Sequence, residues 1–276
     1  MAVVAVSITL LIGTPVVYLW VLLPILCPIG GLPWCLAVVS FIWAAGNLAL
    51  NYTLCVRTSP GHPTAPAQAP AAPPEVRGES GAHAVQGDQA APARWAPTCT
   101  TCHVVKPARA HHCSICQRCV LRMDHHCAFI NACVGYYNYR FFLRMLWYLS
   151  LTCLHILVAL GLHEWGVRSP NATLGMLLQL EAWQTPLLLV SAVFFTAGLL
   201  FTALHTYLLL TNRTCVELAA GLGRPGGSPY DLGWRSNVLQ VFGSLPWLGC
   251  VCLPMWGPLP DPEGLQSVGI DDEALV

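Results

Sequence analysis

The chain has 276 residues, of which 55% are hydrophobic and 9% are charged, and its formal net charge at pH 7 is zero. Soluble domains carry about 25% charged residues, so this composition argues against an ordinary soluble protein. Without an excess of positive charge there is also no reason to expect nucleic acid as a partner. Four apolar stretches approach the length of about 20 residues that a membrane-spanning helix needs.

The first two apolar stretches predict a transmembrane hairpin over residues 1–56. Residues 1–27 carry no charged side chain, and they lack the basic region and cleavage site of a signal peptide. We therefore predict a first helix over about 6–26, bent at Pro15 and Pro24. A turn rich in Gly and Pro at 27–33 leads to a second predicted helix over about 34–55.

Residues 57–97 change character, being dense in Pro, Ala and Gly and nearly free of large apolar side chains. Such a segment cannot bury enough apolar surface to offset the entropy lost on ordering it. We predict a disordered cytosolic linker.

Residues 99–133 contain seven of the fourteen cysteines. The spacing C-x2-C-x9-H-x6-C occurs there twice, interleaved and offset by fourteen residues. The two copies define the ligand sets Cys99, Cys102, His112 and Cys119, and Cys113, Cys116, His126 and Cys133. Three thiolates and one imidazole are a usual ligand set for structural zinc. The pattern therefore predicts two zinc ions that brace one cysteine-rich domain over 98–140, between the second and third helices.

The two ligand sets use six of the seven cysteines in this stretch and leave Cys127 unassigned. Cys127 stands where a third copy would begin, but Ile130 and Arg140 occupy two of the positions that a third site would need. Cys127 directly follows Asp124, His125 and the zinc ligand His126. A thiol beside an imidazole and a carboxylate is the composition of an activated nucleophile, so we predict Cys127, His125 and Asp124 as the catalytic residues.

Two further apolar stretches, at about 142–162 and 186–210, predict the third and fourth transmembrane helices within 141–210, joined by a loop at 163–185. A C-terminal segment at 211–256 is predicted to pack on the helices or lie at the membrane interface. The acidic tail, 257–276, is predicted to be disordered. The predicted fold class is an all-α membrane protein with four transmembrane helices.

Basic residues predict the orientation in the membrane. Nine of the thirteen Lys and Arg lie between Arg57 and Arg144, three follow the fourth helix, and Arg168 alone lies in the 163–185 loop. This distribution places both termini and the cysteine-rich domain in the cytosol and the loop in the lumen. The expected location is an endomembrane, Golgi or endoplasmic reticulum, with the plasma membrane as the alternative.

The tetrapeptide DHHC at 124–127 ends the run KPARAHHCSICQRCVLRMDHHC, which begins at Lys106, and NACVGYYN follows at 131–138. Together these segments resemble the DHHC-type protein S-acyltransferases. The likeness is strong over about 99–142. TCVE at 214–217 resembles the TTxE motif of that family, with Cys215 replacing a threonine, which is expected to weaken one hydrogen bond. Tyr230 and Asn237 match its C-terminal motif. In the family these two elements pack against the catalytic unit and the membrane domain.

The resemblance implies a palmitoyltransferase reaction in two steps. A long-chain acyl group, such as that of palmitoyl-CoA, passes from acyl-CoA to Cys127, and then to a cysteine of a cytosolic or membrane protein. The lipid bilayer would hold the acyl tail, and Lys106, Arg109 and His111 are candidates to bind the phosphates of coenzyme A. Ala128 and Phe129 replace the proline and tryptophan of most members.

Three other functions compete with this one. A non-catalytic zinc-module adaptor would not need Asp124, His125 and Cys127 together. A membrane-anchored RING-type ubiquitin ligase would end its ligand pattern on a C-x2-C pair, whereas this pattern ends on the single Cys133. A transporter would carry buried charges in its spans.

Overall fold

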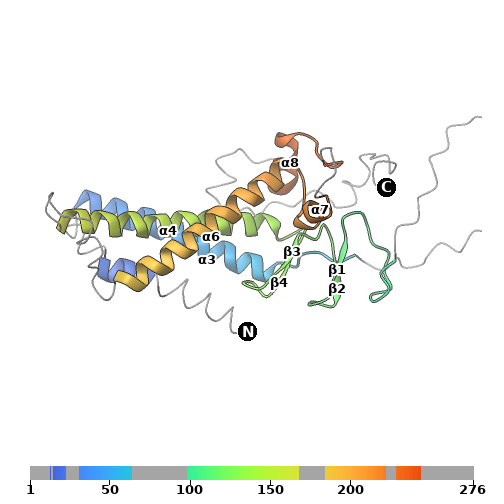
Figure 1. Cartoon of the computed structure of the whole chain (residues 1–276), viewed down its shortest axis with the longest axis horizontal. Helices are drawn as coiled ribbons and strands as arrows, with labels where there is room; N and C mark the ends of the chain where they lie inside the picture. The colour runs from blue at the N-terminus through green and yellow to red at the C-terminus, as the bar shows by residue number, and fades with distance from the viewer. Residues whose placement is uncertain are drawn as a thin grey trace, which may run out of the picture.

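The computed structural model describes residues 13, 15–22, 31–63, 98–167, 184–221 and 228–243. Figure 1 shows a bundle of long helices that cross one another obliquely, with small β-hairpins and short helices gathered at one end of the bundle. The helices are α3 (Leu32–Arg57), α4 (Tyr139–Val167) and α6 (Gln184–Leu210). Helix α4 is central, because it packs against both α3 and α6.

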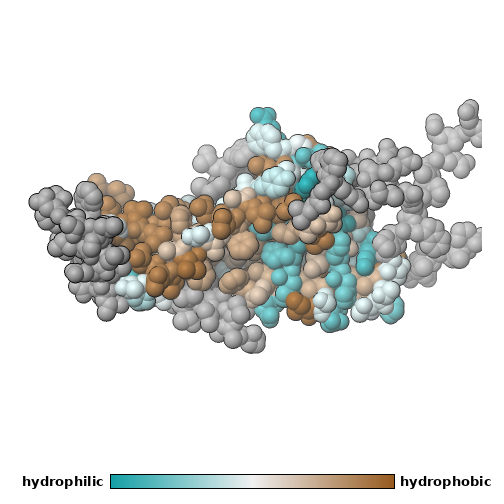
Figure 2. All heavy atoms as spheres, in the orientation of Figure 1, coloured by the Kyte–Doolittle hydropathy of each residue, from teal (hydrophilic) through white to brown (hydrophobic). Residues whose placement is uncertain are grey.

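Three helices in the described part of the chain are long and apolar enough to cross a membrane, namely Leu32–Arg57, Tyr139–Leu162 and Gln184–Leu210. They coincide with three of the four predicted spans. Of the predicted first span, a π-helical turn, η1 (Tyr18–Leu22), and a few residues before it are described, and the rest lies outside the described residues. The apolar outer surface of the bundle contrasts with the hydrophilic end that holds the hairpins (Figure 2).

The bundle contains two apolar clusters. Tyr18, Phe41 and Ile156 belong to the cluster far from the hairpins. The second cluster joins α3, α4 and the cysteine-rich unit, and it contains Phe142 together with Cys127. The bundle and the cysteine-rich unit therefore share one apolar core where they meet.

The cysteine-rich unit is built from two matching antiparallel hairpins. Strand β1 (His111–Cys113) pairs with β2 (Arg118–Val120), and β3 (His125–Cys127) pairs with β4 (Ala132–Val134). In each hairpin the histidine ligand stands directly opposite a cysteine ligand of the same predicted set, because the register pairs His112 with Cys119 and His126 with Cys133. The fourteen-residue repeat of the sequence is thus a structural repeat.

Residues 59–62, which the sequence assigned to the linker, pack on the cysteine-rich unit instead. The carbonyl of Gly61 accepts a hydrogen bond from the backbone N–H of Leu121, and that of Pro60 accepts one from Tyr137. Gly61 has a φ of +95°, which favours glycine. These backbone hydrogen bonds could not be read from composition, and the remainder of the predicted linker from residue 64 to 97 lies outside the described residues.

Two short helices follow α6. Helix α7 (Cys215–Ala220) begins with a capping box between Thr214 and Glu217, which satisfies two backbone N–H groups at its start. Helix α8 (Trp234–Phe242) packs on α6 and α4. The side chain of Asn237 donates to the carbonyl of Leu210 over 2.7 Å, which ties α8 to the end of α6.

Candidate active site and metal centres

The two predicted ligand sets each converge on one point. In the first, Cys99, Cys102, His112 and Cys119 bring their ligand atoms within 4.8 Å of one another, and Cys113, Cys116, His126 and Cys133 do the same in the second. The Nδ1 atom of His112 lies 3.2 Å from Cys102 Sγ, and that of His126 lies 3.3 Å from Cys116 Sγ. Ligand atoms of a tetrahedral Cys3His zinc site are about 3.5 Å apart, so both sets fit zinc.

The hairpin β1–β2 contributes to both sets. It carries His112 and Cys119 of the first set and Cys113 and Cys116 of the second. Loss of either metal would therefore disturb a hairpin that the other metal also needs. The apolar cluster that lies wholly within the described part of the unit is small, with Cys113, Val120 and Cys133 as its buried members, so metal binding has to supply much of the folding free energy.

The backbone conformation of the two predicted metal-binding turns occurs a third time, after Cys127, although the ligand residues do not recur there. His103 and Gln117, each four residues after the first cysteine of a ligand set, have φ angles of 55° and 54°. Asn131, four residues after Cys127, has a φ of 51°. Cys127 therefore occupies the first position of a metal-binding turn whose other ligands are missing.

This turn directs backbone N–H groups at the sulfur of its first cysteine. The N–H of Cys102 donates to Cys99 Sγ over 3.4 Å, and the N–H of Cys116 donates to Cys113 Sγ over 3.3 Å. At the third turn, the backbone N–H groups of Ile130 and Phe129 lie near the sulfur of Cys127 and lower the pKa of its thiol. In the metal sites this arrangement stabilises a zinc-bound thiolate, and at Cys127 it stabilises a thiolate that no ligand set claims.

His125 lies between Asp124 and Cys127. Its Nδ1–H donates to Asp124 Oδ2 over 2.6 Å, and the ring lies close enough to Cys127 to lower the pKa of that thiol. The Asp124 side chain is 2% exposed and that of His125 28% exposed. This is the order of carboxylate, imidazole and thiol that the sequence predicted.

The interactions of this triplet shift each pKa. Burial raises the pKa of Cys127, but the hydrogen bonds from His125 and from the turn outweigh burial, so its pKa lies below the ordinary value. Burial lowers the pKa of His125, whereas its bonds to Asp124 and Cys127 raise it, with a net increase. Both directions favour a thiolate next to an imidazolium.

Asp124 has further partners that the sequence analysis missed. His205, near the end of α6, is 2% exposed, and its Nδ1 lies 4.0 Å from Asp124 Oδ2. The hydroxyl of Tyr139 lies 3.4 Å from the same nitrogen. A lone histidine inside an apolar span was the available signal, but nothing in the sequence places position 205 beside position 124.

Cys215 contacts Asp124 through its backbone. The N–H of Cys215, at the start of α7, donates to Asp124 Oδ1 over 3.1 Å. This contact does not depend on the side chain at position 215, so the replacement of threonine leaves it intact. The thiol of Cys215 also lies close enough to His125 to contribute to the raised pKa of that imidazole.

Arg109 joins the cysteine-rich unit to the C-terminal segment. Its guanidinium donates to both carboxylate oxygens of Glu217 and to the side-chain and backbone oxygens of Asn212, over 2.9 and 3.0 Å. The ring of Tyr230 lies 4.2 Å from the guanidinium carbon. Of the three residues predicted to bind coenzyme A, Arg109 is thus committed to protein partners, whereas Lys106 and His111 are half-buried on the cysteine-rich unit.

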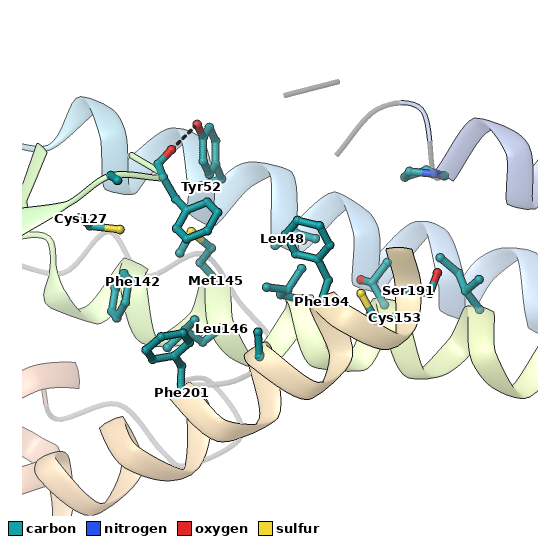
Figure 3. A pocket seen from close by; sticks show the side chains of 18 of the residues that line it. Leu48, Tyr52, Cys127, Phe142, Met145, Leu146, Cys153, Ser191, Phe194 and Phe201 are labelled. Atoms are coloured by element: carbon teal, nitrogen blue, oxygen red, sulfur yellow. Dashed lines mark hydrogen bonds between the residues drawn. The ribbon is translucent and has the colours of Figure 1, made fainter. Parts of the chain in front are cut away.

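A cavity of about 330 Å³ begins at Cys127 and continues between the membrane-spanning helices. Figure 3 shows Cys127 at one end, Phe142, Met145 and Phe201 beyond it, and Cys153 with Ser191 toward the other end. Ala128 and Phe129 also line the cavity. Phe129 is held there because its carbonyl accepts a hydrogen bond from the Tyr52 hydroxyl over 3.1 Å.

Comparison with known proteins agrees with this geometry. The family model described as DHHC palmitoyltransferase matches residues 96–221. Palmitoyltransferase ZDHHC20-A of Danio rerio is 36% identical over 185 residues, which are 63% of this chain and 49% of that protein. Palmitoyltransferase ZDHHC20 of Homo sapiens is 36% identical over 190 residues, 63% of this chain and 48% of that protein.

Palmitoyltransferase ZDHHC15A of Danio rerio is 37% identical over 151 residues, 52% of this chain and 44% of that protein. The chain spans about half the length of the curated relatives it matches. The matched region contains both ligand sets, the Asp124–His125–Cys127 triplet and the capping box of α7. The resemblance predicted from the sequence is confirmed, and residues 96–221 are a domain of the DHHC palmitoyltransferase family.

Proposed function

We propose that this chain is a protein S-acyltransferase in which Cys127 receives a long-chain acyl group from acyl-CoA and passes it to a cysteine of another protein. One observation carries the proposal. Cys127 belongs to neither predicted zinc ligand set, lies beside His125, whose imidazole lowers the pKa of the thiol, and lines a mainly apolar cavity that continues between the helices. A structural thiol would need neither the imidazole nor the cavity.

Asp124, His125 and Cys127 are the proposed catalytic residues. The Asp124 carboxylate accepts the Nδ1–H of His125, which fixes the orientation of the ring. His125 then holds the proton that Cys127 gives up. Zinc in the two Cys3His sets, when bound, serves to hold the strands on either side of this triplet, and His126 fixes the backbone between His125 and Cys127.

In the first step the Cys127 thiolate attacks the thioester carbonyl of acyl-CoA. A new C–S bond forms as the bond to coenzyme A breaks, and the leaving thiolate takes up the proton held by His125. In the second step His125 accepts the proton of an incoming protein thiol, which attacks the acyl-enzyme. Cys127 leaves as a thiolate, and the acyl group ends on the acceptor cysteine.

The cavity is the proposed site of the acyl chain. It is lined almost entirely by apolar side chains, Met145, Leu146 and Phe194 among them. Burial contributes about 0.8 kcal/mol for each methylene group, so a chain of palmitoyl length would be held strongly. Ser191 and Cys153, toward the end away from Cys127 (Figure 3), are placed to limit the length of chain accepted.

Lys106, Arg109 and His111 remain the proposed cation cluster for coenzyme A. Because Arg109 already donates to Glu217 and Asn212, we assign direct phosphate contacts to Lys106 and His111 and a supporting role to Arg109. The acceptors are cytosolic or membrane proteins that present a cysteine at the membrane surface.

We further propose four membrane spans, with the cysteine-rich unit on the cytosolic face of an endomembrane. The three candidate spans and the concentration of basic residues between Arg57 and Arg144 support this arrangement. The proposed domains are the hairpin of spans at 1–56, the linker, the zinc domain at 98–140, the spans within 141–210, and the C-terminal packing segment.

The test is self-acylation. Full-length protein purified in detergent is incubated with a labelled long-chain acyl-CoA and then treated with hydroxylamine, which cleaves thioesters. We expect a hydroxylamine-sensitive label on the wild type and none on Cys127→Ser. A zinc-module adaptor would bind zinc but take up no such label, and that result would replace the enzyme proposal.

A further inference from the structure

We propose that the protein has a third Zn²⁺ site, an inhibitory one, which shares the Asp124–His125 pair with the catalytic site. Its ligands are Asp124, His125, His205 and Cys215, whose ligand atoms all lie within 4.8 Å of one another. The two structural sets meet the same spacing. Neither the family resemblance nor the fourteen-residue repeat points to this third group, because His205 and Cys215 lie outside the repeat.

The four ligands come from three separate parts of the fold. Asp124 directly precedes β3 and His125 is its first residue, His205 is near the end of α6, and Cys215 is the first residue of α7. The His125 and His205 rings lie 5.7 Å apart between centroids, and Asp124 Oδ2 lies 2.6 and 4.0 Å from their Nδ1 atoms. Tetrahedral ligation needs ligand atoms about 3.5 Å apart. The distance to His205 would therefore shorten, and the distance to His125 would lengthen as the metal replaces the hydrogen bond between Asp124 and His125.

The chemistry of the group suits zinc. One thiolate, two imidazoles and one carboxylate are all common zinc ligands, and the thiolate and carboxylate together balance the charge of the ion. The surroundings supply one supporting hydrogen bond of the kind that orients a metal ligand. The Cys215 N–H donates to Asp124 Oδ1, which leaves Oδ2 toward the imidazoles.

Binding at this site should be weaker than at the two Cys3His sets. It offers one thiolate instead of three, and the half-buried guanidinium of Arg122 lies close enough to interact with Asp124, which opposes a second positive charge. His125 is 28% exposed, so an ion can enter and leave. A weak, accessible metal site next to two structural zinc sites is the arrangement expected if zinc inhibits the enzyme reversibly.

Inhibition follows from the shared residues and rests on the proposed function. When Zn²⁺ binds, the Cys215 thiol releases its proton to solvent and His125 becomes a metal ligand. The imidazole can then no longer accept the proton of Cys127 or of an acceptor thiol. The Asp124 carboxylate is diverted from His125 to the metal at the same time.

Zinc binding at the third site is measured directly, without an activity assay. Full-length protein that keeps its two resident zinc ions is dialysed to equilibrium against radioactive Zn²⁺. We expect a third, weaker equivalent in the wild type. Cys215→Thr keeps the backbone contact to Asp124 and removes the thiol, so it should raise the dissociation constant of the third equivalent at least about tenfold. His205→Phe removes the imidazole while keeping a ring of similar shape, and it should have the same effect.

Cys127→Ser is the matched control, because Cys127 is not a member of the cluster, and it should retain the third equivalent. Saturation at two equivalents would overturn the proposal. So would a third equivalent that both Cys215→Thr and His205→Phe retain at full affinity, or one that Cys127→Ser abolishes, since the metal would then sit on the nucleophile.

Two further measurements complete the test. Co²⁺ added to the wild type with its resident zinc should give a thiolate-to-cobalt charge-transfer absorption, and its absence would refute ligation by Cys215 without any variant. Added Zn²⁺ should also inhibit acyl labelling of the wild type at least tenfold more strongly than that of Cys215→Thr. A protein that binds the third zinc but never labels would refute the proposed function and leave the metal site standing.

Discussion

The guanidinium of Arg109 and the carboxylate of Glu217 are joined by two parallel hydrogen bonds, Nε to Oε1 over 2.5 Å and Nη2 to Oε2 over 2.7 Å. The Glu217 carboxylate also accepts the backbone N–H of Thr214 over 2.9 Å, which completes the cap of α7. The next residue, Cys215, donates its N–H to Asp124. The ion pair thus fixes the position of the helix start that holds the proposed catalytic carboxylate.

We expect Arg109→Lys to loosen this connection. Lysine keeps the charge but cannot make the paired bonds of a guanidinium, and loss of hydrogen bonds to a charged group costs about 1–3 kcal/mol. The melting temperature in detergent should fall, and acyl labelling should fall with it because Asp124 is less firmly held. Thermal unfolding and labelling are measured on the same preparation.

Arg118→Lys is the control for that change, because Arg118 is exposed on β2 and should tolerate the substitution. If Arg109→Lys unfolded at the wild-type temperature and labelled normally, the ion pair would have no role in holding the site.

The sequence predicted the cysteine-rich unit well because its information is local. Ligand spacing repeats every fourteen residues, and short hairpins such as β1–β2 place each ligand opposite its partner. Three helices were likewise predicted to within a few residues, because the requirement for about 20 apolar residues is also local. The Asp124–His125 bond could be predicted since the two residues are adjacent.

Long-range contacts could not be predicted in the same way. His205 approaches Asp124, and Arg109 reaches Glu217, only because α4 and α6 pack side by side and the chain after α6 turns back on the cysteine-rich unit. Arg144, near the start of the predicted third helix, is 1% exposed, and its guanidinium carbon lies 5.7 Å from the ring centroid of Phe242 on α8. Such contacts depend on helix packing, which apolar periodicity leaves undetermined.

Removal of zinc should unfold the cysteine-rich unit as a whole. Cys99→Ser removes a ligand of the first set and Cys116→Ser one of the second, but β1–β2 serves both sets. Either variant is therefore expected to lose more than one equivalent of zinc and to become sensitive to protease. Metal analysis of the purified variants, with Cys35→Ser at an exposed position on α3 as the control, measures this. A variant that kept one full equivalent in a protease-resistant unit would show that the two sites are independent.

Ser191→Phe should shorten the acyl chain that the enzyme prefers. The side chain of Ser191 is 1% exposed and lines the cavity away from Cys127, so a phenyl ring there would fill space that the end of a long chain needs. Competition between acyl-CoA donors of different length measures the preference. Leu189→Phe on the same helix is the control, because Leu189 is 60% exposed and does not line the cavity. An unchanged preference in Ser191→Phe would place the end of the acyl chain elsewhere.

The neighbouring histidines His125 and His126 should respond differently to replacement by alanine. His126 Nδ1 faces the thiols of Cys113 and Cys116, so His126→Ala should lose zinc. His125 faces Asp124, so His125→Ala should keep both zinc ions and slow acyl labelling by about 10²–10⁴-fold, the usual contribution of a general base. Equal zinc content in the two variants would refute the assignment of His126.

The sharpest separation is between Cys127 and Cys133, which lie on the paired strands β3 and β4. Cys127 belongs to neither ligand set, so Cys127→Ser should keep its zinc and its protease resistance. It should lose the hydroxylamine-sensitive label, because a serine hydroxyl is far less ionised than a thiol and would form an ester in place of a thioester.

Cys133→Ser should lose zinc first and lose acyl labelling as a consequence. Cys133 Sγ lies 3.6 Å from Cys116 Sγ and 3.8 Å from His126 Nδ1, so its loss opens the second metal set and removes folding free energy directly. Zinc content, protease resistance and labelling are compared for both variants in one detergent. A Cys127→Ser protein without zinc, or a Cys133→Ser protein that kept its metal and labelled normally, would exchange the roles of nucleophile and ligand.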